Sequence, residues 1–133
     1  MTAAGIPALL EPIQARLDAA TPGPWEASDV VDMDVDGTYE LAHVLAPDPG
    51  EPETSTLGVA LGILRPDAEF IANSPTDTAR LLAAVKAVEE LHKPFTHHFL
   101  TPPAGSVEIC LACHEQWPCE TVSAVEAALR GEA

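Results

Sequence analysis

A stretch near the middle of the chain decides the expected fold. Residues 31–45 read VDMDVDGTYELAHVL. On both sides of Asp36-Gly37, apolar residues alternate with polar ones at a period of two, which is the spacing of a β-strand with two different faces. Asp-Gly between two such runs favours a type I′ turn, because both residues tolerate a positive φ. The stretch therefore predicts a β-hairpin with Val, Met, Tyr and Leu side chains on one face and carboxylates on the other.

The segment before this hairpin has the periodicity of a helix. Apolar residues recur at three- and four-residue steps from Ile6 to Leu17, which predicts a helix with one apolar face. The sequence Thr21-Pro22-Gly23-Pro24 then ends any helix, since proline and glycine both interrupt helical backbone.

Further elements are expected after the hairpin. Residues 46–56 contain several prolines and predict a mobile loop. Leu57–Leu64 is apolar and predicts a third strand, and a short helix is expected over 67–72. Ser74 has the character of an N-cap before Pro75, which predicts a separate, longer helix ending near Leu91.

The C-terminal third is expected to begin with a loop and end in a helix. Residues 93–106 contain three prolines and two adjacent histidines, which favours irregular structure. Residues 120–130 have helical apolar spacing and predict a closing helix.

The cysteines carry the clearest chemical signal. All three of them, Cys110, Cys113 and Cys119, lie within ten residues, and the first two have the spacing of a zinc knuckle. Because Cys119 directly precedes the closing helix, its thiolate would also benefit from the helix N-terminus.

A tetrahedral zinc ion needs a fourth ligand, and histidines are available upstream. We expect His98 or His97 to complete the site, because the intervening loop can fold back over the knuckle. His114 adjoins Cys113 and is too constrained by its neighbour to be favoured. Such a closed site predicts one structural zinc ion per chain. Ordinary buried or surface thiols, or a redox-active pair, are the alternatives.

These elements together predict an α+β fold. A small antiparallel sheet, made of the hairpin plus a third strand, packs with two main helices, and zinc staples the C-terminal helical end. We expect residues 1–95 to form an α+β core domain and residues 96–133 to form a zinc-binding subdomain packed on it. A metal would help such a chain, because its core contains few aromatic residues.

The charge balance excludes several classes of function. The chain has 133 residues, with 21 acidic side chains against 6 basic ones and a formal charge of −15. It is too acidic to bind nucleic acid over a broad face. No apolar run is long enough to span a membrane. The N-terminal residues lack the features of a signal peptide, so a reducing, cytoplasmic location is expected.

The acidic residues gather in the predicted sheet. Ten acidic residues and no Lys or Arg lie between Leu17 and Leu64. Asp32, Asp34 and Asp36 are expected to form a surface that binds a basic protein partner. A merely solubilising face and a nucleic-acid mimic are the alternatives. The same aspartates resemble the opening of an EF-hand, but His43 occupies the position where that loop needs a bidentate Glu.

No catalytic signature is present. The chain lacks a G-x-S-x-G motif, a P-loop, a dinucleotide-binding glycine fingerprint and an H-E-x-x-H motif. A closed site of three thiolates and one imidazole has no position for a substrate. We therefore favour a non-enzymatic protein over an enzyme.

Three motifs point to a family. Residues 16–25 (RLDAATPGPW), residues 67–72 (DAEFIA) and the cysteine-rich tail resemble those of small uncharacterised actinobacterial and actinophage proteins, and the first two resemble Ead-like phage proteins. The resemblance covers about residues 11–30, 65–92 and 110–130. It implies an accessory gene of a phage or mobile element and no particular activity.

The sequence thus predicts a phage or mobile-element accessory protein that binds a host macromolecule, most simply a host protein with a basic surface. One alternative is a zinc-dependent enzyme or small-molecule scavenger with an open metal position. Another is a DNA-mimic inhibitor.

Overall fold

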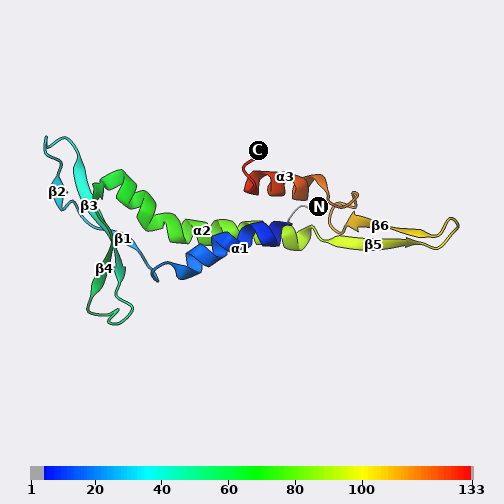
Figure 1. The fold of residues 1–133 in the computed structure, drawn as a ribbon, viewed down its shortest axis with the longest axis horizontal. Coiled ribbons are helices and arrows are strands. Elements are labelled where there is room, and N and C mark those ends of the chain that lie inside the picture. The colour runs from blue at the N-terminus through cyan, green and yellow to red at the C-terminus, as the bar shows by residue number, and fades with distance from the viewer. Residues whose placement is uncertain (1–4, 133) are drawn as a thin grey trace. The chain divides into compact units, whose positions relative to one another are not determined.

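The computed structural model describes residues 5–132 and confirms the α+β class (Figure 1). The helices of the described part are α1 (Ile6–Ala19), α2 (Arg65–Leu91) and α3 (Glu120–Leu129). The strands are β1 (Glu26–Ala27), β2 (Asp32–Met33), β3 (Glu40–Pro47), β4 (Thr56–Leu64), β5 (Pro94–Phe99) and β6 (Gly105–Cys110). Strands β1 to β4 form one antiparallel sheet, and β5 and β6 form a separate two-stranded sheet. None of the described helices combines the length and apolar character needed to cross a bilayer.

The chain divides into two compact units. One contains the residues up to Ala15 together with those from Leu81 onward, and the other contains Arg16–Arg80. This division differs from the predicted boundary at residue 95. The reason is that α2 is one continuous helix whose first half belongs to the sheet unit and whose second half belongs to the C-terminal unit.

The sheet is built around β3. Strand β4 pairs with β3 over most of its length, while β1 and β2 pair with different parts of β3. The turn before β3 differs from the expected type I′ turn, since Gly37 has a positive φ of 66° and Asp36 does not. Asp34 holds this turn: its Oδ1 accepts the backbone N–H groups of Thr38 at 2.7 Å and Tyr39 at 2.9 Å.

The core of the sheet unit lies on the face opposite to the predicted one. Ala42, Val44 and Ala46 of β3 are buried, whereas Leu41 and Leu45 are only half-buried. The small side chains face α2, where Ala68 and Ala72 complete the buried cluster. The fully buried positions are thus filled by small side chains, and the larger Trp25, Val59 and Ile63 pack against them while staying partly exposed.

The expected break between two helices near Ser74 is wrong, because α2 runs through it with Pro75 inside. Proline has no N–H to donate to the preceding turn. Side chains just before it donate to carbonyls one turn back: Asn73 Nδ2 to the Glu69 oxygen at 2.8 Å and Ser74 Oγ to the Phe70 oxygen at 2.7 Å. Ser74 is therefore an interior helical residue and not an N-cap.

Two predicted loops are also more regular than expected. Residues 48–55 close a hairpin between β3 and β4, with the N–H of Asp48 donating to the Ser55 oxygen at 3.0 Å. The predicted loop 93–106 contains β5 and most of β6, paired from Pro94–Cys110 to Phe99–Gly105. The third strand and the closing helix lie where the sequence predicts them.

The packing of α2 on β3 generates a stability prediction. Ala68→Leu adds volume at a site with no exposed surface and should destabilise the sheet unit by about 1–3 kcal/mol. Ala79→Leu, on an exposed position of the same helix, should change stability by less than about 0.5 kcal/mol. Urea unfolding of both variants measures the difference, and equal effects would contradict the close approach of α2 to β3.

Candidate metal centre

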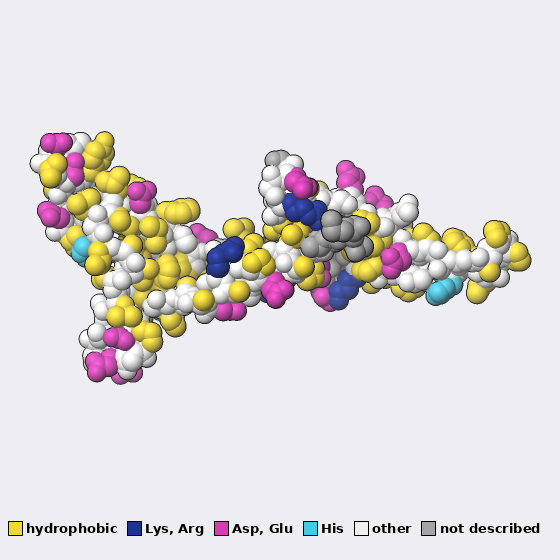
Figure 2. Space-filling view, viewed as in Figure 1, with side chains coloured by type: hydrophobic (Ala, Val, Ile, Leu, Met, Phe, Trp, Pro, Cys, Tyr) yellow, Lys and Arg dark blue, Asp and Glu magenta, His cyan; other side chains and the backbone are white. Residues whose placement is uncertain are grey.

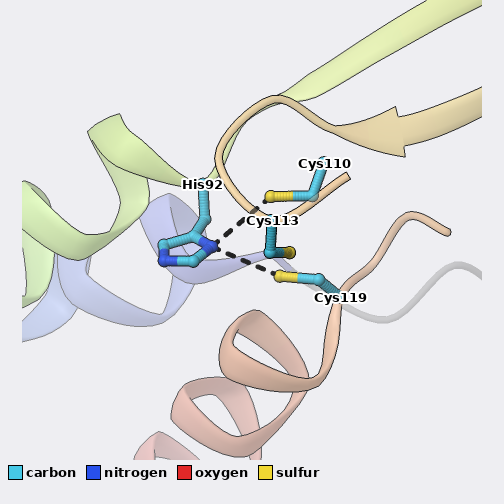
Figure 3. Close-up of side chains that lie close together, drawn as sticks. All are labelled: His92, Cys110, Cys113 and Cys119. Atoms are coloured by element: carbon cyan, nitrogen blue, oxygen red, sulfur yellow. Dashed lines mark hydrogen bonds between the residues drawn. The ribbon is translucent and has the colours of Figure 1, made fainter. Parts of the chain in front are cut away.

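Four side chains that can bind a metal ion come together in the C-terminal unit. They are His92, Cys110, Cys113 and Cys119, and their ligand atoms all lie within 4.8 Å of one another. Figure 3 shows the His92 imidazole facing the sulfurs of Cys110 and Cys119, with Cys113 between them. The group has the composition of a Cys₃His site and could hold a metal ion.

The knuckle turn begins where β6 ends. The N–H of His114 donates to the Cys110 oxygen at 2.9 Å, and the N–H of Cys110 donates to the Glu115 oxygen at 2.7 Å. His114 has a φ of 61°, in the left-handed region that allows the chain to reverse after Cys113. Its side chain is not part of the ligand group, as the sequence analysis favoured.

The chain returns beside β6 and brings the third cysteine back to the turn. The N–H of Trp117 donates to the Glu108 oxygen at 2.9 Å. Cys119 is the N-cap of α3 and is almost fully buried. Its sulfur thus lies at the N-terminus of α3, beside the knuckle turn that carries the other two cysteines.

The histidine comes from the C-terminal end of α2. Pro94 pairs with Cys110 and the N–H of Leu111 donates to the Lys93 oxygen at 2.9 Å, so the residues just after α2 lie against the knuckle. The Nδ1 atom of His92 is 3.4 Å from the Cys110 sulfur and 3.5 Å from the Cys119 sulfur.

The structure corrects the predicted fourth ligand. His97 and His98 are exposed on β5, where they pair with Val107 and Ser106. A strand advances by about 3.3 Å per residue, so their place on β5 carries both histidines away from Pro94 and the cysteines. Neither belongs to the ligand group.

Two distances within the group match those of a tetrahedral zinc site. Zinc lies about 2.3 Å from thiolate sulfur and about 2.0–2.1 Å from imidazole nitrogen. Tetrahedral angles then place sulfur and nitrogen about 3.5 Å apart and two sulfurs about 3.8 Å apart. The two measured distances from His92 Nδ1, 3.4 and 3.5 Å, agree with this geometry.

The pKa values of two cysteines diverge within the cluster. Burial opposes ionisation of Cys110, but backbone groups of Cys113 and Ala112 and the side chains of Cys113 and His92 stabilise its thiolate and lower its pKa to about 6. At Cys113 the backbone of Glu115 lowers the pKa, while desolvation and the sulfurs of Cys110 and Cys119 raise it to about 11. Adjacent thiolates repel one another, and a bound cation removes that repulsion.

A small hollow lies beside His92. It has a volume of about 100 Å³, and Glu89, Glu126 and Trp117 line it together with His92. The Glu126 carboxylate is also paired with Arg130 at 3.4 Å.

The predicted acidic surface lies in the other unit. Asp32 and Asp36 are exposed, whereas Asp34 is partly buried and accepts the turn hydrogen bonds described above. The position that an EF-hand would give to Glu belongs to His43, whose Nδ1 accepts the N–H of Gly62 at 2.9 Å. Residues 32–43 thus form a hairpin and do not wrap around a cation.

Comparison with known proteins gives no relative. No protein-family model, no curated protein and no solved structure matches the chain. The geometry of the site therefore carries the functional argument.

Sequence reasoning found the three cysteines and missed His92. The available signal was its position: His92 follows the last residues of a helical stripe and stands two residues before Pro94. The end of a helix that lies beside the knuckle can place a histidine near the cysteines, as a folded-back loop can.

The ligand assignment predicts a contrast between two histidines. His92→Ala should weaken binding of Co²⁺ by more than the roughly 10–100-fold cost of losing an outer-shell partner. His98→Ala, an exposed histidine on β5, should leave binding unchanged. Absorption titration with Co²⁺ reports both affinity and thiolate ligation, and loss of binding in His98→Ala but not in His92→Ala would contradict the assignment.

The pKa values predict how metal affinity depends on pH. Cys113, with a pKa of about 11, carries its proton at neutral pH and must release it to bind a metal. Affinity should therefore rise by at least about tenfold per pH unit through the neutral range, because binding displaces the Cys113 proton. Below about pH 6, protonation of Cys110 makes the dependence steeper. Competition with a chelator of known proton affinity measures the slope, and a pH-independent affinity would contradict this account.

Proposed function

We propose that the chain is a non-enzymatic binding protein whose Cys₃His centre holds a structural zinc ion. The observation that carries the proposal is the convergence of four protein ligands within 4.8 Å of one another. Four ligands complete the tetrahedron that zinc prefers in structural sites, which leaves no position for a substrate.

Zinc is the metal that this ligand set favours. Thiolate ligands select soft or borderline metals, and imidazole suits zinc well, whereas magnesium and calcium require oxygen ligands. A mixed sulfur and nitrogen tetrahedron is characteristic of structural zinc.

The location of the ligands supports a structural role. The end of α2, the end of β6 and the start of α3 each contribute at least one of them. An ion bound to all three would tie together elements whose described apolar core is small, and its binding free energy would become folding free energy.

The acidic sheet unit supports a binding role. It carries thirteen acidic residues against three basic ones between Arg16 and Arg80. Its proposed partner is a protein with a basic surface, met in part through Asp32 and Asp36. The resemblance to Ead-like phage proteins suggests that this partner belongs to a host cell.

The test is the metal content of protein purified without a histidine tag, measured by plasma mass spectrometry. We expect about one zinc ion per chain and a large loss of thermal stability on chelation. A protein with no bound metal and an unchanged melting temperature would overturn the structural zinc site.

A matched pair of variants makes the result specific to the cluster. Cys119→Ser should abolish retention of the metal and lower the melting temperature to that of the chelated protein. Ser123→Ala, four residues further along α3, should retain the metal. Retention of a full equivalent by Cys119→Ser would contradict the ligand set.

A further inference from the structure

The four-stranded sheet has a second face that its own core does not use. Residues paired across neighbouring antiparallel strands share a face. Leu41 pairs with Leu64, and Leu45 pairs with Gly58, so these residues lie on the face opposite to Ala42 and Val44. Within the described part of the sheet unit, the buried cluster lies on the α2 side only.

This second face is accessible and carries mainly leucines, with His43 between Leu41 and Leu45 on β3. A β-carbon on Gly58 would lie 2.6 Å from Leu61 Cδ2, so the Leu61 side chain covers the glycine beside Leu45. Leu61 is 62% exposed and Leu64 is 40% exposed. We refer to Leu41, Leu45, Leu61 and Leu64 as the outer face.

Two hollows adjoin the outer face at the ends of the sheet. One of about 160 Å³ is lined by Leu45 and Glu26 together with prolines and Ala46. A larger one of about 380 Å³ lies where the sheet meets the start of α2 and is lined by Leu64 and Tyr39 together with the charged side chains of Glu40, Arg65 and Glu69. Apolar side chains of a bound segment could enter both hollows. A flat surface of leucines would offer no such concave sites.

Carboxylates surround this apolar band. Glu26 pairs with Leu45 and Asp32 pairs with Leu41, so both acids share the outer face at its β1–β2 edge. Acidic side chains also gather at the two hairpin ends of the sheet (Figure 2). These ends contain Asp36 on one side and Asp48, Glu51 and Glu53 on the other.

The positive charge of the sheet unit does not neutralise this rim. Arg65 forms ion pairs with Glu40 at 3.6 Å and Glu69 at 3.5 Å. Within the described residues, none of the ion pairs involves the acids at the hairpin ends or at the β1–β2 edge. The combination is an apolar centre with a negative rim.

We propose that the outer face docks a segment of a partner protein in which apolar side chains are flanked by Lys or Arg on both sides. The inference rests on the proposed binding function and specifies where and by what chemistry the partner is recognised. Charge complementarity identifies the occupant: cations meet the acidic rim while leucine-like side chains cover the band. A second copy would bring two chains of formal charge −15 together, and a nucleic acid would meet the same repulsion.

The test uses the full zinc-loaded chain and two labelled peptides. One has a leucine-rich centre with several lysines at each end, and the other has serine in place of every leucine. We expect the leucine-rich peptide to bind at least about tenfold more tightly by fluorescence anisotropy, because only it covers the apolar band.

Variants locate the binding site. Leu61→Ser combined with Leu64→Ser should weaken the leucine-rich peptide by about tenfold or more and leave the serine peptide unchanged. Leu81→Ser is the matched control, since Leu81 is 67% exposed on α2 and lies outside the outer face. All the leucines involved are exposed, so the variants should retain the metal and their circular dichroism spectra.

The outcomes separate this inference from the proposed function. Equal binding of the two peptides, unaffected by the double substitution, would overturn docking on the outer face and leave charge-led binding by the acidic unit intact. A loss of binding in Leu81→Ser as large as in the double variant would also overturn it. Failure of both peptides to bind at low salt would overturn the acidic binding function together with its site.

Discussion

The approach of His92 Nδ1 to two cysteine sulfurs, at 3.4 and 3.5 Å, is the contact on which the C-terminal unit depends. It joins the end of α2 to the end of β6 and to the N-cap of α3. The buried apolar side chains of this unit, among them Ile6, Leu10 and Val122, are modest in size and number. Metal ligation at this point would supply the cross-link that so small a core needs.

The sheet unit is held together by a different constraint, which is close packing of small residues. Ala42 and Val44 on β3 meet Ala68 and Ala72 on α2. Since these side chains contribute little apolar area, their stabilising effect depends on short distances and on the absence of voids. Trp25, Val59 and Ile63 pack against this cluster, whereas Leu61 and Leu64 are exposed on the outside of the sheet.

The proposed zinc site and the proposed docking surface lie in different units. The metal centre would stabilise one unit and would take no part in recognition, because its ligands are all protein groups. The acidic unit would carry recognition, because it combines an exposed apolar band with a negative rim. Helix α2 runs continuously from the sheet unit into the C-terminal unit.

The sequence by itself determined the α+β class, the hairpin, the third strand, the closing helix and the three cysteines of the candidate metal centre. Each of these rests on local signals: strand or helix periodicity, a turn dipeptide, and the C-x₂-C spacing. Cysteine ligands so near one another in the chain are constrained by the turn that contains them. Local patterns gave a wrong helix start at Ser74. In α2 the Ser74 hydroxyl donates to the carbonyl of Phe70 and does not cap a helix.

Only the tertiary structure decided the fourth ligand and the buried face of β3. His92, His97 and His98 are all close in sequence to the knuckle, and the register of β5 on β6, with Pro94 opposite Cys110, selects the first of them. The buried face of β3 was likewise set by the helix packed on it, because Ala68 and Ala72 of α2 lie against Ala42 and Val44. The fourth ligand and the buried face both depend on contacts between distant segments. The periodicity of a single strand contains no information about such contacts.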